Sequence, residues 1–182
     1  HTELEAVYEE YNIGIAQDSR KVWEALNTML FPTHPYGTQT TIGTQEHLKN
    51  PSITNIKNYF NKWYRPNNVA ICMAGDFDPD EVIAILERHF GSWEPNYNPY
   101  RPEFAPMQPI AAPIDTTVVG QEAEFVALGW RLGAGNSLEV DTMDVVAEML
   151  SNGTAGLMDL NLNQPHEVMM CGAYSDAMTD YS

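Results

Sequence analysis

The stretch "NNVAICMAGDFDPDEVIAILERHFG", residues 67–91, decides the expected fold class, because its pattern changes partway along. Residues 67–77 are a mainly apolar run, which predicts a buried strand. Asp78 can then cap a helix that has Pro79 at its first position and Gly91 just past its end. A strand thus leads directly into a helix, and together with the order of the other expected elements this predicts an α+β fold.

The rest of the chain shows the same two patterns. Apolar residues at helical spacing predict helices over residues 2–30, with a break near Asp18 or Ser19, and over residues 53–64 after a Ser52 cap, 137–151 and 157–164. Apolar runs predict strands over residues 116–120, 124–132 and 166–178, and residues 31–47 are expected to form an ordered loop.

A proline-rich segment divides the chain. Residues 93–114 contain six prolines and few helix or strand signals, which predicts a semi-rigid linker. On either side we expect an incomplete α+β piece, one over residues 1–92 and the other over residues 115–182.

The composition excludes some partners. Twenty-five acidic residues against nine basic ones give a net charge of −16, which repels nucleic acid and anionic membrane surfaces. No apolar run approaches the length of a membrane span, so we expect a soluble protein. Cys72 and Cys171 lie in apolar runs and are expected to be buried free thiols, which leaves the redox compartment open.

The first predicted helix carries an unusual pair of acids. Glu3 and Glu10 are seven residues apart, so they point in directions only about 20° apart around the helix axis, with Val7 between them. Acids at a helix N-terminus complement the helix dipole, and this explanation suits Glu3 better than Glu10. On spacing alone, this helix-dipole explanation is favoured over a functional site.

Three stretches resemble the M16 zinc metallopeptidases, the family of insulinase, pitrilysin and the mitochondrial processing peptidase. They are "ELEAVYEE" at residues 3–10, "HPYGTQTTIGT" at 34–44 and "YFNKWYRPNNVAICMAGDFDPDEV" at 59–82. The family has a Glu-x6-Glu pattern that Glu3 and Glu10 match. The resemblance thus implies that Glu10 is a zinc ligand and that Glu3 is a supporting carboxylate of the catalytic centre.

The resemblance also implies a domain organisation. Residues 1–92 would be the C-terminal part of a catalytic M16 domain, and residues 115–182 the N-terminal part of the following M16 domain. Both would be incomplete half-domains of the LuxS/MPP-like metallohydrolase fold. Where elements are missing, exposed sheet edges would favour self-association.

The chain departs from the family pattern at the zinc motif. It has no His-x-x-Glu-His, and His34, one of its five histidines, is interpreted as packing within its loop. Catalytic zinc normally has three protein ligands. The resemblance places the motif upstream of residue 1, so we expect an inactive fragment of a bacterial-type enzyme. Its compartment stays open between the bacterial cytoplasm and the periplasm. In the intact enzyme, zinc-activated water would hydrolyse peptides or unfolded polypeptide segments.

Two other functions stay open. Some M16 relatives lack the zinc motif and act as structural or substrate-holding subunits, although the retained Glu3 and Glu10 argue mildly against this origin. An acidic module that binds calcium is the third hypothesis. Asp76, Asp78 and Asp80 have the spacing of a calcium loop, but the sequence lacks the glycine that an EF-hand has at its sixth position.

Overall fold

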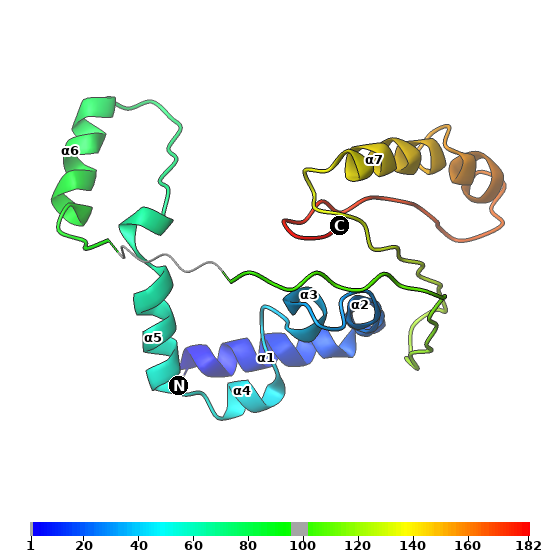
Figure 1. The fold of residues 1–182 in the computed structure, drawn as a ribbon, viewed down its shortest axis with the longest axis horizontal. Helices are drawn as coiled ribbons and strands as arrows, with labels where there is room; N and C mark the ends of the chain where they lie inside the picture. Colours follow the sequence, from blue (N-terminus) through cyan, green and yellow to red (C-terminus); the bar gives the residue numbers. More distant parts are fainter. Residues whose placement is uncertain (1, 96–101) are drawn as a thin grey trace. The chain divides into compact units, whose positions relative to one another are not determined.

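The computed structural model describes residues 2–95 and 102–182, and these residues form helices and extended segments but no strand (Figure 1). The α+β prediction is therefore wrong for this part of the chain. None of the described helices is both long and apolar enough to cross a membrane. The elements are α1 (Thr2–Ala16), α2 (Asp18–Leu30), α3 (Pro35–Thr38), α4 (Gln45–Lys49), α5 (Ile53–Trp63), η1 (Pro66–Asn68), α6 (Pro79–Phe90), α7 (Leu138–Leu150) and η2 (Asp159–Asn163).

The segments predicted to be strands run without regular secondary structure. A strand is defined by the hydrogen bonds that it makes to a neighbouring strand. Within the described residues, no such ladder forms along residues 67–77, 116–132 or 166–178. Their apolar side chains are left exposed, to 88% at Val119 and 97% at Met169.

Two helices begin at the capping residues that the sequence predicts. The Asp78 carboxylate accepts hydrogen bonds from the backbone N–H groups of Asp80 (2.8 Å) and Glu81 (3.2 Å) at the start of α6. The Ser52 hydroxyl accepts one from the N–H of Asn55 (3.3 Å) at the start of α5. Each side chain satisfies N–H groups that have no partner within the helix.

The N-terminal helical region divides near the predicted position. The break is at Gln17, which is the N-cap of α2 although its side chain makes no capping hydrogen bond. Asp18 is the first helical residue, and its carboxylate binds a distant turn instead. The predicted ordered loop contains the short helix α3 and the start of α4, which Thr44 caps.

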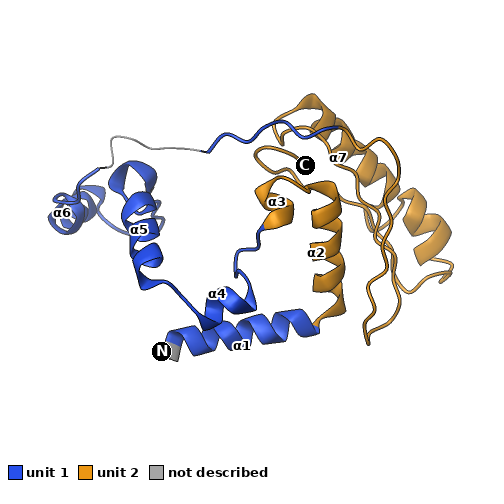
Figure 2. Cartoon of the chain, turned by 60° about the horizontal axis from the view of Figure 1, so that its bottom comes forward, with its two compact units in different colours: residues 1–16, 39–108 blue, residues 17–38, 109–182 orange. Residues whose placement is uncertain are grey.

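The chain forms two compact units, shown in blue and orange in Figure 2. One contains residues 1–16 and 39–108, and the other contains residues 17–38 and 109–182. Each unit combines two separate stretches of sequence, so the units do not coincide with the predicted domains. The predicted domain boundaries stay a prediction.

The orange unit has a small core around Phe31, which is 2% exposed. The ring of Tyr36 meets Phe31 edge-on at 5.5 Å, and the ring of Tyr181 lies 6.2 Å away. The C-terminal segment is held there because the N–H of Leu132 donates a hydrogen bond to the Ser182 carbonyl at 2.7 Å. This core therefore joins α2 to the end of the chain.

The blue unit leaves much apolar surface uncovered. One face of α5 exposes Ile56 to 55% and Tyr59 to 63%. Cys72 is exposed, so its predicted burial is wrong, and Cys171 in the other unit is half-buried. The reason is the same as for the strands: residues 67–77 have no ladder partner among the described residues to cover them.

Candidate functional site

The acidic pair lies on α1, as the sequence predicts. Glu3 and Glu10 belong to one continuous helix and both are exposed. Seven residues correspond to about 20° of rotation and about 10.5 Å of rise, so the two carboxylates share a face at different heights. No ion pair within the described residues engages either one. Their catalytic and zinc-binding roles stay predictions.

A different face of α1 holds α4. The Gln45 side-chain amide donates a hydrogen bond to the Tyr8 hydroxyl at 2.7 Å, and the Lys49 ammonium lies 5.4 Å from the centre of the Tyr8 ring. The hydrogen bond from Gln45, followed by that from Lys49, lowers the pKa of Tyr8. Tyr8 lies about 140° around the helix from Glu3, so this contact leaves the acidic pair uncovered.

The acidic pair is not a complete metal site by itself. Residues 2–95 and 102–182 contain no group of three or more His, Cys, Asp or Glu side chains that could hold a metal ion together. A tetrahedral zinc site with one open position needs three protein ligands. Zinc at Glu10 would therefore need further ligands beyond those that the described residues bring together.

Asp18 is a buried carboxylate that anchors a turn. Its Oδ2 accepts hydrogen bonds from the N–H groups of Gln121 (2.5 Å) and Glu122 (2.7 Å), and its Oδ1 accepts one from the Lys21 ammonium (2.8 Å). The Lys21 hydrogen bond and then that from Glu122 lower the pKa of Asp18, against the opposing effect of burial. An ionised and fully engaged carboxylate of this kind is structural.

His34 packs within its loop, which confirms the prediction. The side chain is 1% exposed, its Nδ1 accepts a hydrogen bond from the N–H of Tyr36 (3.3 Å), and its Nε2 lies 3.3 Å from the Asp180 carboxylate. The ring of Tyr181 meets it nearly edge-on. A His–carboxylate pair is suited to proton transfer. Here the His34 ring is enclosed, whereas the Asp180 side chain is 46% exposed, so the imidazole itself does not face a substrate.

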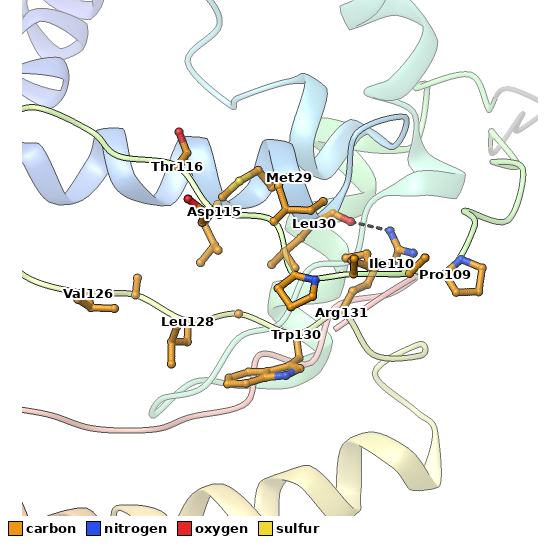
Figure 3. A pocket seen from close by; sticks show the side chains of 17 residues that line it. Met29, Leu30, Pro109, Ile110, Asp115, Thr116, Val126, Leu128, Trp130 and Arg131 are labelled. Atoms are coloured by element: carbon orange, nitrogen blue, oxygen red, sulfur yellow. Dashed lines mark hydrogen bonds between the residues drawn. The ribbon is translucent and has the colours of Figure 1, made fainter.

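An open hollow of about 770 Å³ lies beside α2 (Figure 3). Its walls are Leu26, Met29 and Leu30 of α2 together with segments 109–116 and 126–131. The guanidinium of Arg131 donates a hydrogen bond to the Leu30 carbonyl at 2.6 Å, shown as a dashed line. No histidine or cysteine lines the hollow. Its lining is mainly apolar with one carboxylate, Asp115, so it can accept apolar side chains, and that single carboxylate does not make up a metal site.

Asp159 is a second buried carboxylate, and the sequence analysis missed it. It is 4% exposed, and its Oδ2 accepts hydrogen bonds from the N–H groups of Asn152 (2.9 Å), Gly153 (2.9 Å) and Gly156 (3.2 Å). Burial opposes ionisation, but these hydrogen bonds and one from the Asn163 amide lower the pKa of Asp159. The turn "NGTAG", with a carboxylate shortly after it, is the signal that could have revealed this loop.

The comparisons with known proteins point to one family. The profile of a family described as Peptidase M16 inactive domain matches residues 52–181, more than half of the chain. The zinc protease PqqE of Helicobacter pylori is 26% identical over 132 residues, which are 71% of this chain and 30% of that protein. An uncharacterized zinc protease of Mycobacterium leprae is 35% identical over 63 residues, 35% of this chain and 14% of that protein.

A eukaryotic relative is similar over a shorter stretch. The probable mitochondrial-processing peptidase subunit beta of Schizosaccharomyces pombe is 27% identical over 75 residues, 41% of this chain and 16% of that protein. The chain thus spans less than a third of the length of each of these relatives. The profile match does not include α1, so the acidic pair lies outside the matched residues. The extent of the profile match shows that this chain belongs to the M16 peptidase family.

Proposed function

We propose that this chain is part of a zinc-dependent endopeptidase, in which residues 52–181 are a non-catalytic portion and α1 contributes to the metal centre. The observation that carries the proposal is the pair Glu3 and Glu10 on one exposed face of α1 in a chain of the M16 family. The relatives named zinc protease support the same activity class.

The donor chemistry of the pair fits zinc. Carboxylate oxygen is an established zinc ligand, and no ion pair among the described residues occupies Glu10. We assign Glu10 as the ligand and Glu3, two turns away, as the carboxylate that orients it and adjusts the local charge. When bound, zinc lowers the pKa of a water molecule and polarises the scissile carbonyl. The remaining ligands would come from a longer protein that contains this chain.

The proposed substrates are peptides or unfolded polypeptide segments, since proteases of this family act on polypeptides. An extended substrate exposes the backbone carbonyl that a metal-activated water attacks. The net charge of −16 favours basic segments as substrates, because a negative field attracts them before they bind.

A second candidate function is that of a non-catalytic M16 subunit that holds substrate or supports a catalytic partner. One observation favours it: the profile that matches residues 52–181 describes an inactive domain. In this case Glu3 and Glu10 would have no zinc-dependent role, and their exposed positions on α1 would reflect only solvation and the helix dipole.

Experiments on the full-length protein that contains this chain can distinguish the two candidate functions. We expect the purified protein to carry zinc, measured by elemental analysis, and to cleave an unstructured peptide. Glu10→Gln should remove bound zinc and cleavage together, because an amide is a much poorer ligand than a carboxylate. Glu3→Gln should retain zinc and lower kcat, by roughly the 10- to 100-fold that loss of a supporting group costs.

Glu9→Gln is the matched control, since Glu9 is exposed on the same helix but points elsewhere. It should change neither zinc content nor cleavage. A protein without zinc and without activity, in which all three variants resemble the wild type, would support the non-catalytic subunit instead. The 182-residue chain alone is expected to be inactive, and zinc-dependent cleavage by it would contradict the assignment of ligands.

A further inference from the structure

The loop around Asp159 contains the dipeptide Asn152-Gly153, which the proposed function does not use. Gly153 has φ of +80°, a backbone conformation that favours glycine. Asn152 is exposed, and its side chain makes hydrogen bonds to the backbone of nearby residues. The chemistry of an Asn-Gly pair makes this loop a candidate for spontaneous covalent modification.

The modification is deamidation through a cyclic imide. The backbone nitrogen of Gly153 loses its proton to solvent and attacks Cγ of Asn152, forming a C–N bond. The Nδ2 amino group takes a proton from solvent, the bond from Cγ to Nδ2 breaks, and ammonia leaves. Water then opens the ring at one of its two carbonyls and gives aspartate or isoaspartate. Glycine permits this reaction readily, since it has no side chain to hinder the approach of its nitrogen.

In the folded chain, hydrogen bonds hold both reacting groups in place. The N–H of Gly153 donates its hydrogen bond to Asp159 Oδ2 at 2.9 Å. Removing that proton would place a second negative charge beside the carboxylate, which is unfavourable. The N–H of Asn152 donates to the same oxygen at 2.9 Å, so the backbone on both sides of the reacting bond is fixed.

The side chain of Asn152 is also fixed. Its Oδ1 accepts hydrogen bonds from the N–H groups of Thr154 (3.1 Å) and Ala155 (2.9 Å), and its Nδ2 donates one to the Glu148 carbonyl (3.1 Å). For the ring to close, Cγ must come to bonding distance of the Gly153 nitrogen. These three hydrogen bonds resist that movement of the side chain.

From this geometry we infer that Asn152 is a deamidation site, and that the hydrogen bonds to Asp159 slow its reaction while the loop is folded. Local opening of the loop therefore sets the rate of the modification. The site belongs to the orange unit and is independent of the proposed peptidase activity.

Modification would have consequences beyond the loop. Isoaspartate lengthens the backbone by one methylene group and would draw the two N–H groups away from Asp159. Asp159 Oδ1 also accepts a hydrogen bond from the Asn163 amide at 3.2 Å. Asn163 in turn accepts from the N–H of Cys171 at 2.9 Å and lies 3.3 Å from its sulfur. Loss of the Asp159 anchor would release the Cys171 thiol to solvent.

The test follows Asn152 in the purified 182-residue chain by peptide mapping with mass spectrometry. The chain is kept at mildly alkaline pH, either in native buffer or in concentrated urea. We expect deamidation to be at least about tenfold slower in native buffer, because the loop must open first. Asp159→Asn should bring the native rate toward the urea rate, while Asp144→Asn, an exposed change on α7, should not.

Equal wild-type rates in native buffer and in urea would overturn the inference, and so would a folded Asp159→Asn variant with the wild-type rate. If circular dichroism shows that this variant is unfolded, the wild-type rates in native buffer and in urea still test the inference. Alkylation gives a second readout, with the exposed thiol of Cys72 as an internal reference. Cys171 should react faster in deamidated chains, and unchanged reactivity would contradict the proposed path through Asn163.

Discussion

A Cβ atom on Gly120 would lie only 2.0 Å from Oδ2 and from Cγ of Asp18. This close approach brings the N–H groups of Gln121 and Glu122 within hydrogen-bonding distance of the buried carboxylate. Real Cβ contacts are never so short, so either the turn or the start of α2 would have to move. Glycine at position 120 is therefore a requirement of the Asp18 anchor.

Gly120→Ala should destabilise the orange unit because the added methyl group displaces the Asp18 carboxylate from its two backbone donors. The midpoint of urea unfolding, measured by circular dichroism, should fall clearly below that of the wild type. Gly172→Ala is the control, since a Cβ there would meet only the Ser151 hydroxyl at an ordinary 3.6 Å. Equal midpoints for the two variants would contradict the steric argument.

Acid should weaken the orange unit through Asp18 and Asp159. Both carboxyl groups have a pKa below the ordinary value of 3.8 in the folded chain, because hydrogen bonds stabilise their ionised forms. Their contribution to stability is therefore complete above about pH 4 and is lost as the pH falls through the lower folded pKa. The stability difference between the wild type and Asp18→Asn should shrink over that range. A difference that stays constant from pH 7 to pH 2 would show that Asp18 is not the titrating group.

Phe31→Ala should be among the most destabilising single changes in the orange unit. Phe31 is 2% exposed and contacts the rings of Tyr36 and Tyr181, so its removal leaves a cavity that these rings can only partly fill. The expected loss in the free energy of unfolding is about 3–5 kcal/mol. Urea titration measures it, with Phe125→Ala as the control because Phe125 is 48% exposed. The control should cost less than half as much.

Asp78→Ala should cost about 1 kcal/mol, because it removes the acceptor for two N–H groups at the start of α6. The helical circular dichroism signal and its thermal midpoint report the change. Asp76→Ala, two residues earlier and outside the helix, should stay within about 0.5 kcal/mol of the wild type. An Asp76 effect as large as the Asp78 effect would point to general charge rather than to capping.

Local sequence signals predicted the helices well, whereas the predicted strands do not form in the described residues. Asp78 and Ser52 fix helix starts through bonds that span only a few residues, so the sequence contains all the necessary information. A strand such as residues 67–77 depends on partners elsewhere in the protein. The described residues supply no ladder for it, and Cys72 is exposed as a result.

The candidate site was predictable only where it depends on helix periodicity. The shared face of Glu3 and Glu10 follows from 3.6 residues per turn. The anchors at Asp18 and Asp159 depend on backbone N–H groups that reach a carboxylate from a turn, and Asp18 is more than one hundred residues from its partner Gln121. Neither composition nor periodicity contains that pairing, so the role of Asp18 could not be singled out beforehand.

The extended segments leave Val119, Val126 and Met169 more than four-fifths exposed on a chain of net charge −16. Mutual repulsion between copies opposes the adhesion of these apolar side chains at low ionic strength. Added salt shortens the range of that repulsion to about 8 Å at physiological ionic strength, and it leaves the apolar attraction in place. Added salt is therefore expected to precipitate this strongly acidic chain, although its net charge alone would predict that it stays in solution.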